Sequence, residues 1–151
     1  MIMTNFLKSR RSVRDFRNKK IDPEIIDKIK ENLKELEQEY GKGDIKFKLY
    51  EYGENIYNGL KGLAGYSGVM VESPHYITVD LGNKEDKTVI YSAYYMEKLV
   101  TSLNKLGIDT CWVSVYDVDM ERRKVIFGES INQVDFVIAI GYQRRKNPLI
   151  T

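Results

Sequence analysis

The apolar run near the carboxyl end of the chain places the strongest limit on its fold. It reads Val134-Asp135-Phe136-Val137-Ile138-Ala139-Ile140-Gly141-Tyr142, almost without polar interruption. A strand with one solvated face alternates apolar and polar residues, whereas a strand covered on both faces is apolar nearly throughout. The run therefore predicts a strand buried on both faces of a sheet, with other elements packed above and below it.

Three further segments have the composition of strands. In 45–49, Ile45, Phe47 and Leu49 alternate with lysines, which is typical of a half-buried strand. Segment 75–81 is rich in β-branched and aromatic residues and follows Pro74, and segment 109–115 has a similar composition. Together with the run at 134–142 they predict a sheet.

Helical patterns separate these strands. Asp22-Pro23-Glu24 is a helix start signal, and the helix it begins ends at Gly41 and Gly43. Its predicted apolar stripe comprises Ile25, Ile29, Leu33, Leu36 and Tyr40. A long pattern over 84–106 is apolar nearly all round, which is expected of a helix at the centre of a fold or in a subunit interface. Shorter helices are predicted at 4–9, within 57–66 and at 119–127.

Together, these strands and helices predict an α/β or α+β sandwich, in which helices cover a sheet. With 151 residues and 42% apolar content, the chain can bury one sizeable core, which predicts a single domain over residues 1–151.

Composition argues against several functional classes. The formal net charge is only +2, so no global basic field points to nucleic acid. No apolar run approaches the roughly 18 residues of a membrane span, and no secretory leader is visible at the start, so a cytoplasmic protein is the default expectation. One histidine and one cysteine cannot form a typical zinc site.

Positive charge is instead concentrated near the amino end, at Arg10, Arg11 and Arg14, with Ser12 between them. A guanidinium presents five donors in a fixed geometry that suits phosphate, so the cluster is a candidate clamp for a phosphate-bearing ligand. The alternative interpretation is a solvated basic turn, which is the usual role of a charge run.

Four segments, in order, resemble a known family. Residues 10–16, Arg-Arg-Ser-Val-Arg-Asp-Phe, look like the entry signature of the nitroreductase family of FMN-dependent oxidoreductases. Residues 73–77 resemble the "A-P-H-Y" strand start of its TM-nitroreductase branch. Residues 106–113 are similar to its "L-G-L-G-T-C-W-V" segment, and 137–142 to its "V-x-A-I-G-Y" strand.

The resemblance implies an α+β fold with a mixed sheet flanked by helices. It also implies a homodimer, with the long helix at the dimer interface and FMN bound between the subunits. Carried over residue by residue, Arg10, Arg11 and Ser12 would contact the FMN phosphate and ribityl chain, and Arg14 would support the same corner. A second basic group near the carboxyl end completes the phosphate site in the family. The candidates for it here are Arg144, Arg145 and Lys146.

The flavin ring would lie near the segment formed by Thr110, Cys111, Trp112 and Val113, where a backbone N–H could hydrogen-bond flavin N5. From their residue types, Cys111 is expected to be a buried small side chain, and His75 to have a structural role. Trp112, Tyr94 and Tyr95 are expected in the core, with a ring near the flavin as the alternative.

The chemistry implied belongs to the flavin and to no acid–base side chain. Hydride from NADH or NADPH would pass to flavin N5 and then to a nitroaromatic, a quinone or another small acceptor. Two features depart from the family pattern. Val113-Ser114-Val115 replaces "V-G-G", and the "P-S-x-x-N-x-Q-P-W" segment of larger members is absent, which suggests a compact or shortened member. The alternatives are a flavin-binding or nucleotide-sensing module without turnover and, less favoured, a phosphate or nucleic-acid binder.

Overall fold

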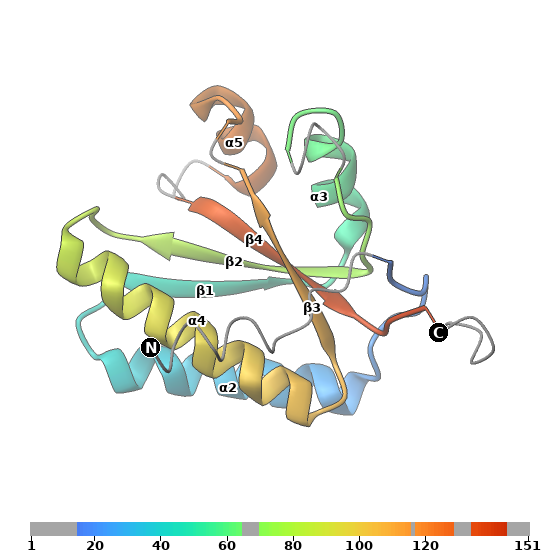
Figure 1. The fold of residues 1–151 in the computed structure, drawn as a ribbon, viewed down its shortest axis with the longest axis horizontal. Helices are drawn as coiled ribbons and strands as arrows, with labels where there is room; N and C mark the ends of the chain where they lie inside the picture. The colour runs from blue at the N-terminus through green and yellow to red at the C-terminus, as the bar shows by residue number, and fades with distance from the viewer. Residues whose placement is uncertain (1–14, 65–69, 116, 129–133, 145–151) are drawn as a thin grey trace, which may run out of the picture.

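A computed structural model describes residues 15–64, 70–115, 117–128 and 134–144 (Figure 1). The helix predicted at 4–9 lies outside these residues. In chain order the described elements are α2 (Pro23–Tyr40), β1 (Ile45–Tyr50), α3 (Gly53–Leu60), β2 (His75–Leu81), α4 (Asp86–Lys105), β3 (Asp109–Ser114), α5 (Met120–Phe127) and β4 (Val134–Gly141).

The strands form a four-stranded sheet in the order β1-β2-β4-β3. All three pairings among the described strands are antiparallel, so the expectation of a mixed sheet is corrected for this part of the chain. The reason is the position of β4. It lies between β2 and β3, and these two strands, joined through α4, run in the same direction without pairing to each other. The predicted α+β class is confirmed.

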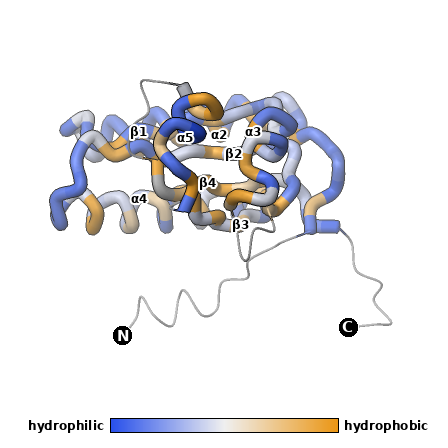
Figure 2. The backbone as a smooth tube through the Cα atoms, turned by 90° about the horizontal axis from the view of Figure 1, so that it is seen from above, coloured by the Kyte–Doolittle hydropathy of each residue, from blue (hydrophilic) through white to orange (hydrophobic). Residues whose placement is uncertain are grey.

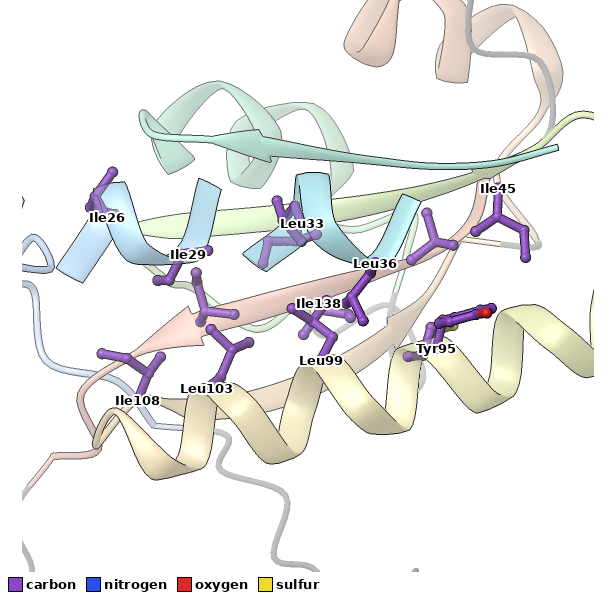
Figure 3. Packing of buried hydrophobic residues seen from close by; sticks show 14 of the residues in the cluster. Ile26, Ile29, Leu33, Leu36, Ile45, Tyr95, Leu99, Leu103, Ile108 and Ile138 are labelled. Carbon is purple, nitrogen blue, oxygen red and sulfur yellow. The ribbon is translucent and has the colours of Figure 1, made fainter. Parts of the chain in front are cut away.

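The sheet is covered on both faces, as the apolar run predicted. Helices α2 and α4 lie on one face, and α3 and α5 lie on the other (Figure 1). Ile138 and Ile140 of β4 face the first layer, and Val137 and Ala139 face the second, all with no exposed surface. Figure 3 shows Ile138 packed between α2 and α4. In a view from above, hydrophobic residues recur along the strands and along α4 (Figure 2).

Local signals explain where the helices begin and end. Helix α2 has Pro23 in its first turn and ends at Gly41, whose φ of 73° lies in the left-handed region that favours glycine. The Asp119 side chain accepts a hydrogen bond of 2.8 Å from the Arg122 N–H at the start of α5. Helix α3 starts at Gly53, earlier than predicted. A Cβ there would lie 2.8 Å from the Pro74 carbonyl oxygen, so the close approach of this backbone requires glycine.

The long helix α4 is only partly covered. Leu99, Val100 and Leu103 in its second half are buried, with at most 1% of their surface exposed. In its first half, Ile90 is 68% exposed and Tyr94 is 46% exposed, whereas Tyr95 is buried. The core position expected for Tyr94 is therefore wrong, and that for Tyr95 is confirmed. None of the helices in the described ranges combines the length and hydropathy that a membrane span requires.

Candidate functional site

Two segments from opposite ends of the sequence pair with each other. Phe16 and Gln143 form an antiparallel bridge. The Arg17 N–H donates to the Tyr142 carbonyl at 2.8 Å, and the Arg144 N–H donates to the Asp15 carbonyl at 3.0 Å. We call this arrangement the 15–17/142–144 pairing. Both segments lie at the same end of the sheet (Figure 1).

Tight packing against β4 supports the pairing. A Cβ on Gly141 would come within 3.1 Å of Phe16 Cδ1 and 3.2 Å of two Pro74 ring carbons. Few Cβ atoms in folded proteins have contacts this short, so the glycine lets Phe16 and Pro74 rest directly on the strand. Phe16 is 5% exposed and belongs to the core beneath α3 and α5.

The pairing begins immediately beside both predicted halves of the phosphate clamp. The predicted site residues Arg10, Arg11, Ser12, Arg14 and Arg145 lie outside the described residues. Their chain neighbours are described: Asp15 follows Arg14 directly, and Arg144 precedes Arg145 directly. Asp15 and Arg144 are hydrogen-bonded to each other. Because adjacent Cα atoms in a chain are about 3.8 Å apart, the chain continues from this one pair into both basic segments.

Arg144 itself is exposed at this place. Its Nε lies 3.2 Å from Asp15 Oδ1, and the two side chains are 66% and 72% exposed. An exposed ion pair of this kind contributes about 0–1 kcal/mol, so it holds the guanidinium only weakly. Arg144 can therefore turn toward an anionic ligand at little cost.

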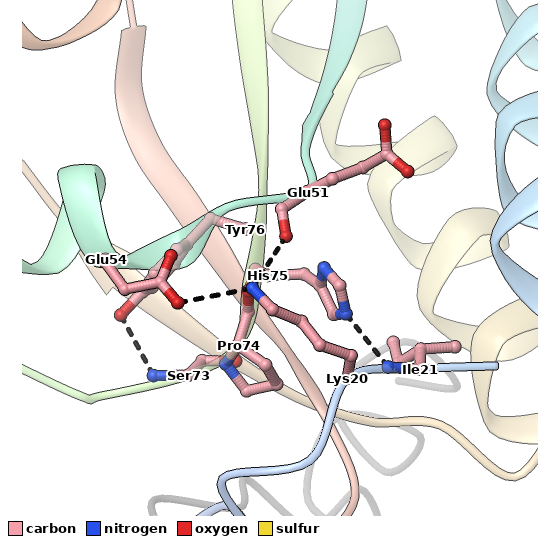
Figure 4. Close-up of polar contacts among 8 residues, drawn as sticks. All are labelled: Lys20, Ile21, Glu51, Glu54, Ser73, Pro74, His75 and Tyr76. Atoms are coloured by element: carbon pink, nitrogen blue, oxygen red, sulfur yellow. Dashed lines mark hydrogen bonds and ion pairs between the residues drawn. The ribbon is translucent and has the colours of Figure 1, made fainter. Parts of the chain in front are cut away.

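A pocket of about 520 Å³ lies against the pairing. Its walls come from the 15–18 segment, α3, residues 70–74 and Arg144. The wall at 70–74 is held by Tyr76, whose hydroxyl donates to the Val71 carbonyl at 2.6 Å and accepts from the Ser73 N–H at 3.1 Å (Figure 4). The charged lining residues are Asp15, Arg17, Glu54, Glu72 and Arg144.

Strand β3 carries the segment predicted to lie near a flavin ring. Thr110, Cys111 and Val113 are buried, with 3–5% of their surface exposed, which confirms the expectation of a buried Cys111. Trp112 is 38% exposed, so its predicted core position is wrong. Strand β3 is an edge strand, and the pairing of Trp112 with Ile138 places its side chain on the sheet face that carries α4, where it lines a pocket with α4 residues.

Strand β3 lies at an edge of the described sheet. Its inner side pairs with β4, and its outer side has no strand partner within the described ranges. Asp109 at its start accepts a 3.0 Å hydrogen bond from the Gln143 N–H, which joins β3 to the 15–17/142–144 pairing. Trp112 lies three residues further along, roughly 10 Å away at the usual rise of a strand. A ligand with an anion at one end and a ring at the other could contact both places.

An apolar patch surrounds the exposed tryptophan. The Trp112 and Phe136 rings lie 6.3 Å apart, and both line a pocket of about 160 Å³ that also includes Val89, Ala93 and Met96 of α4. Phe136 is 41% exposed and Val89 is 43% exposed. We call the exposed set formed by Val89, Ile90, Tyr94, Trp112 and Phe136 the α4 patch.

Contacts of Lys20 and Ile21 connect the chain just after residues 15–18 to the sheet (Figure 4). The Ile21 N–H donates to His75 Nε2 at 2.9 Å, a contact that supports the structural role expected for this histidine. Lys20 Nζ lies 3.1 Å from the Glu51 carbonyl, 3.4 Å from the Pro74 carbonyl and 3.4 Å from Glu54 Oε1. Sequence reasoning did not identify Lys20, because its partners are distant in the chain and no motif marks it.

The described residues contain no group of three or more His, Cys, Asp or Glu side chains arranged to hold a metal ion. The chemistry that they support is anion recognition at the 15–17/142–144 pairing and apolar contact at the α4 patch.

Comparison with known proteins identifies the family. The model described as "Putative TM nitroreductase" matches residues 3–149. The chain belongs to this nitroreductase family, as the ordered segments of its sequence predicted. A comparison with curated proteins gave no match.

Solved structures share the fold at low identity. An FMN-dependent nitroreductase from Clostridium difficile R20291 is 21% identical with a TM-score of 0.73, covering 97% of this chain and 90% of its own. A nitroreductase with bound FMN from Bacteroides fragilis is 18% identical with a TM-score of 0.71, covering 95% and 92%. The FMN-dependent nitroreductase NfnB from Mycobacterium smegmatis, in complex with NADPH, is 13% identical with a TM-score of 0.67, covering 99% and 96%.

Proposed function

We propose that this protein is an FMN-dependent NAD(P)H oxidoreductase of the nitroreductase type. The observation that carries the proposal is the 15–17/142–144 pairing, since it hydrogen-bonds Asp15, the residue that follows the arginine-rich stretch 10–14, to Arg144. Membership of the nitroreductase family, and the FMN and NADPH named for similar structures, support the same function. We propose a single flavin-binding domain over residues 1–151, and a cytoplasmic location stays a prediction.

The residues present suit a flavin mononucleotide. Its phosphate carries close to two negative charges near neutral pH and accepts several hydrogen bonds. Arg10, Arg11 and Arg14, with Ser12 and the second group at Arg144 and Arg145, supply matching donors. The exposed and weakly held guanidinium of Arg144 is the described member of this set.

The remaining residues orient the ring. Bound FMN supplies hydride chemistry, from NADH or NADPH to a nitroaromatic, a quinone or another small acceptor. The outer backbone edge of β3 at Thr110–Val113 offers donors to the ring, and Trp112 offers an apolar face beside it. Buried Cys111 contributes packing and no nucleophile. The protein therefore binds and positions the ring, and no side chain transfers the hydride.

Activity is tested by colour and bleaching. Purified protein is expected to be yellow, to contain flavin near one equivalent per chain, and to bleach when NADH or NADPH is added without oxygen. Colourless protein that takes up no added FMN would overturn the proposal. Stable colour without bleaching would select the alternative of a non-catalytic flavin-binding or nucleotide-sensing module.

The α4 patch supports a homodimer as the functional unit. A single chain leaves Ile90 and Tyr94 exposed on a helix whose other face belongs to the core, and a second copy would cover them. We propose that two copies pack through this patch, with a flavin at each end of the interface.

The proposed dimer predicts that changing the α4 patch lowers the molecular mass in solution. The double variant Ile90→Asp/Tyr94→Asp should be monomeric in light scattering after size exclusion, because buried unpaired carboxylates oppose association. Val125→Asp on α5 is the control, since Val125 is 77% exposed and lies outside the patch. A double variant of unchanged mass would contradict the proposed interface.

A further inference from the structure

Residues 15–21, which we call the entry segment, are anchored at two separate points. Phe16 and Arg17 join the chain at 142–143, and Ile21 is held by His75 through the 2.9 Å hydrogen bond. Ile21 and His75 are each 3% exposed, so this second anchor lies inside the protein. The arginine segment at 10–14 leads directly into the entry segment.

The second anchor requires a neutral imidazole. Ile21 donates its N–H to His75 Nε2, so that nitrogen accepts, and an imidazole nitrogen can accept only when it carries no proton. A protonated ring would place an N–H against the Ile21 N–H and leave a buried charge beside it. The hydrogen bond that fixes Ile21 is therefore lost when His75 is protonated.

Three charged groups face this histidine. Lys20 of the entry segment contributes an ammonium, and Glu51 and Glu54 contribute carboxylates from the end of β1 and from α3. Burial and then Lys20 lower the pKa of His75 below its ordinary value of 6.5, while the Glu51 backbone and then the carboxylates of Glu51 and Glu54 oppose this in part. The ring is consequently neutral at pH 7.

We propose that His75 is a positioning residue for the flavin phosphate site: its neutral imidazole holds the entry segment, whose residues 15–18 line the 520 Å³ pocket together with Arg144, and its protonation weakens phosphate binding. The inference rests on the proposed function, since it assumes that a phosphate-bearing flavin occupies the site. His75 acts through the Ile21 N–H and needs no contact with the ligand.

The sign of the pH effect follows from the lowered pKa. Just below pH 6.5, His75 binds a proton when the protein is unfolded or when Ile21 is released from it. His75 does not bind a proton while it holds Ile21. The stability that this anchor contributes is complete above pH 6.5. It is lost as the pH falls from 6.5 through the lower pKa of the folded protein.

The test compares the pH dependence of FMN affinity in two proteins. Dissociation constants from flavin fluorescence at pH 7.5 and 5.5 are measured for the wild type and for His75→Gln, whose amide oxygen can accept from Ile21 at either pH. The FMN phosphate itself titrates near pH 6, equally in both experiments. We expect the loss of affinity on acidification to be about tenfold greater in the wild type than in the variant. Riboflavin, which lacks the phosphate, should show no such difference.

A second readout does not require flavin. Hydrogen exchange of the protein should show the protection factor of the Ile21 N–H falling about tenfold or more between pH 7.5 and 5.5. The protection factor of the Lys61 N–H, which donates to the Tyr57 carbonyl at the end of α3, should change little. Equal pH dependence of FMN affinity in the two proteins, or unchanged protection at Ile21, would overturn the positioning role. Wild-type protein that binds no FMN at pH 7.5 would instead refute the proposed function, and exchange at Ile21 would still report on the anchor.

Discussion

Replacing Arg10 and Arg11 together with alanine is expected to weaken FMN binding by two orders of magnitude or more and to leave the fold intact. Each charge-assisted contact to a phosphate contributes on the order of 1.5–3 kcal/mol, so two lost contacts suffice. Both residues lie outside the described ranges, and the prediction rests on their connection to the 15–17/142–144 pairing. Fluorescence titration with FMN measures the affinity, and circular dichroism checks the fold.

A matched control separates recognition of the phosphate by the arginines from a general loss of positive charge. The variant Lys46→Ala/Lys48→Ala also removes two positive charges, but from β1, where both lysines lie outside the candidate site. It should bind FMN within a factor of about two of the wild type. If the arginine variant also retains its affinity, the cluster is a solvated surface turn and not a phosphate clamp.

Replacing Ile138 with alanine is expected to lower the free energy of unfolding by about 2–5 kcal/mol. Ile138 has no exposed surface and lies at the centre of β4, so truncation leaves a cavity between the sheet and its first helical layer. Urea denaturation at pH 7.5 measures the change.

The control for this prediction is Val125→Ala, an aliphatic truncation at a side chain that is 77% exposed. It should change the free energy of unfolding by no more than about 0.5 kcal/mol. Comparable losses in the two variants would contradict the placement of β4 at the centre of the core.

The sequence predicted the elements well because their signals are local. The apolar run at 134–142 predicted a doubly covered strand, and β4 is that strand. The start signal at Asp22-Pro23 and the stop at Gly41 bound α2 within a residue. Such signals depend on neighbours in the chain, which the sequence contains directly.

Burial of the side chains on α4 and β3 was harder to predict, because it depends on which elements pack against them in the folded protein. The α4 pattern is apolar nearly all round, but a single chain leaves large apolar side chains such as Ile90 and Tyr94 exposed in the first half of the helix. Trp112 has the character of a core residue, and it is exposed because β3 is an edge strand. Edge position and the extent of helical cover are properties of the assembled sheet.

The candidate site shows the same division. Residue type and family resemblance identified the arginines, while the contact of Asp15 with Arg144 accompanies the bridge between Phe16 and Gln143, which no local pattern specifies. The contacts of Lys20 with Glu51, Glu54 and Pro74 were not predicted either. They join segments whose proximity results from the pairing of β1 with β2 and the start of α3.

The affinity of FMN relative to riboflavin tests the central claim most directly. The two ligands share the ring and the ribityl chain and differ in the phosphate, so the ratio of their affinities isolates the phosphate recognition that we propose for the arginines. Titration of the purified full-length chain at pH 7.5 should show FMN binding about 100-fold or more tightly than riboflavin. Equal affinities for the two flavins would contradict the account.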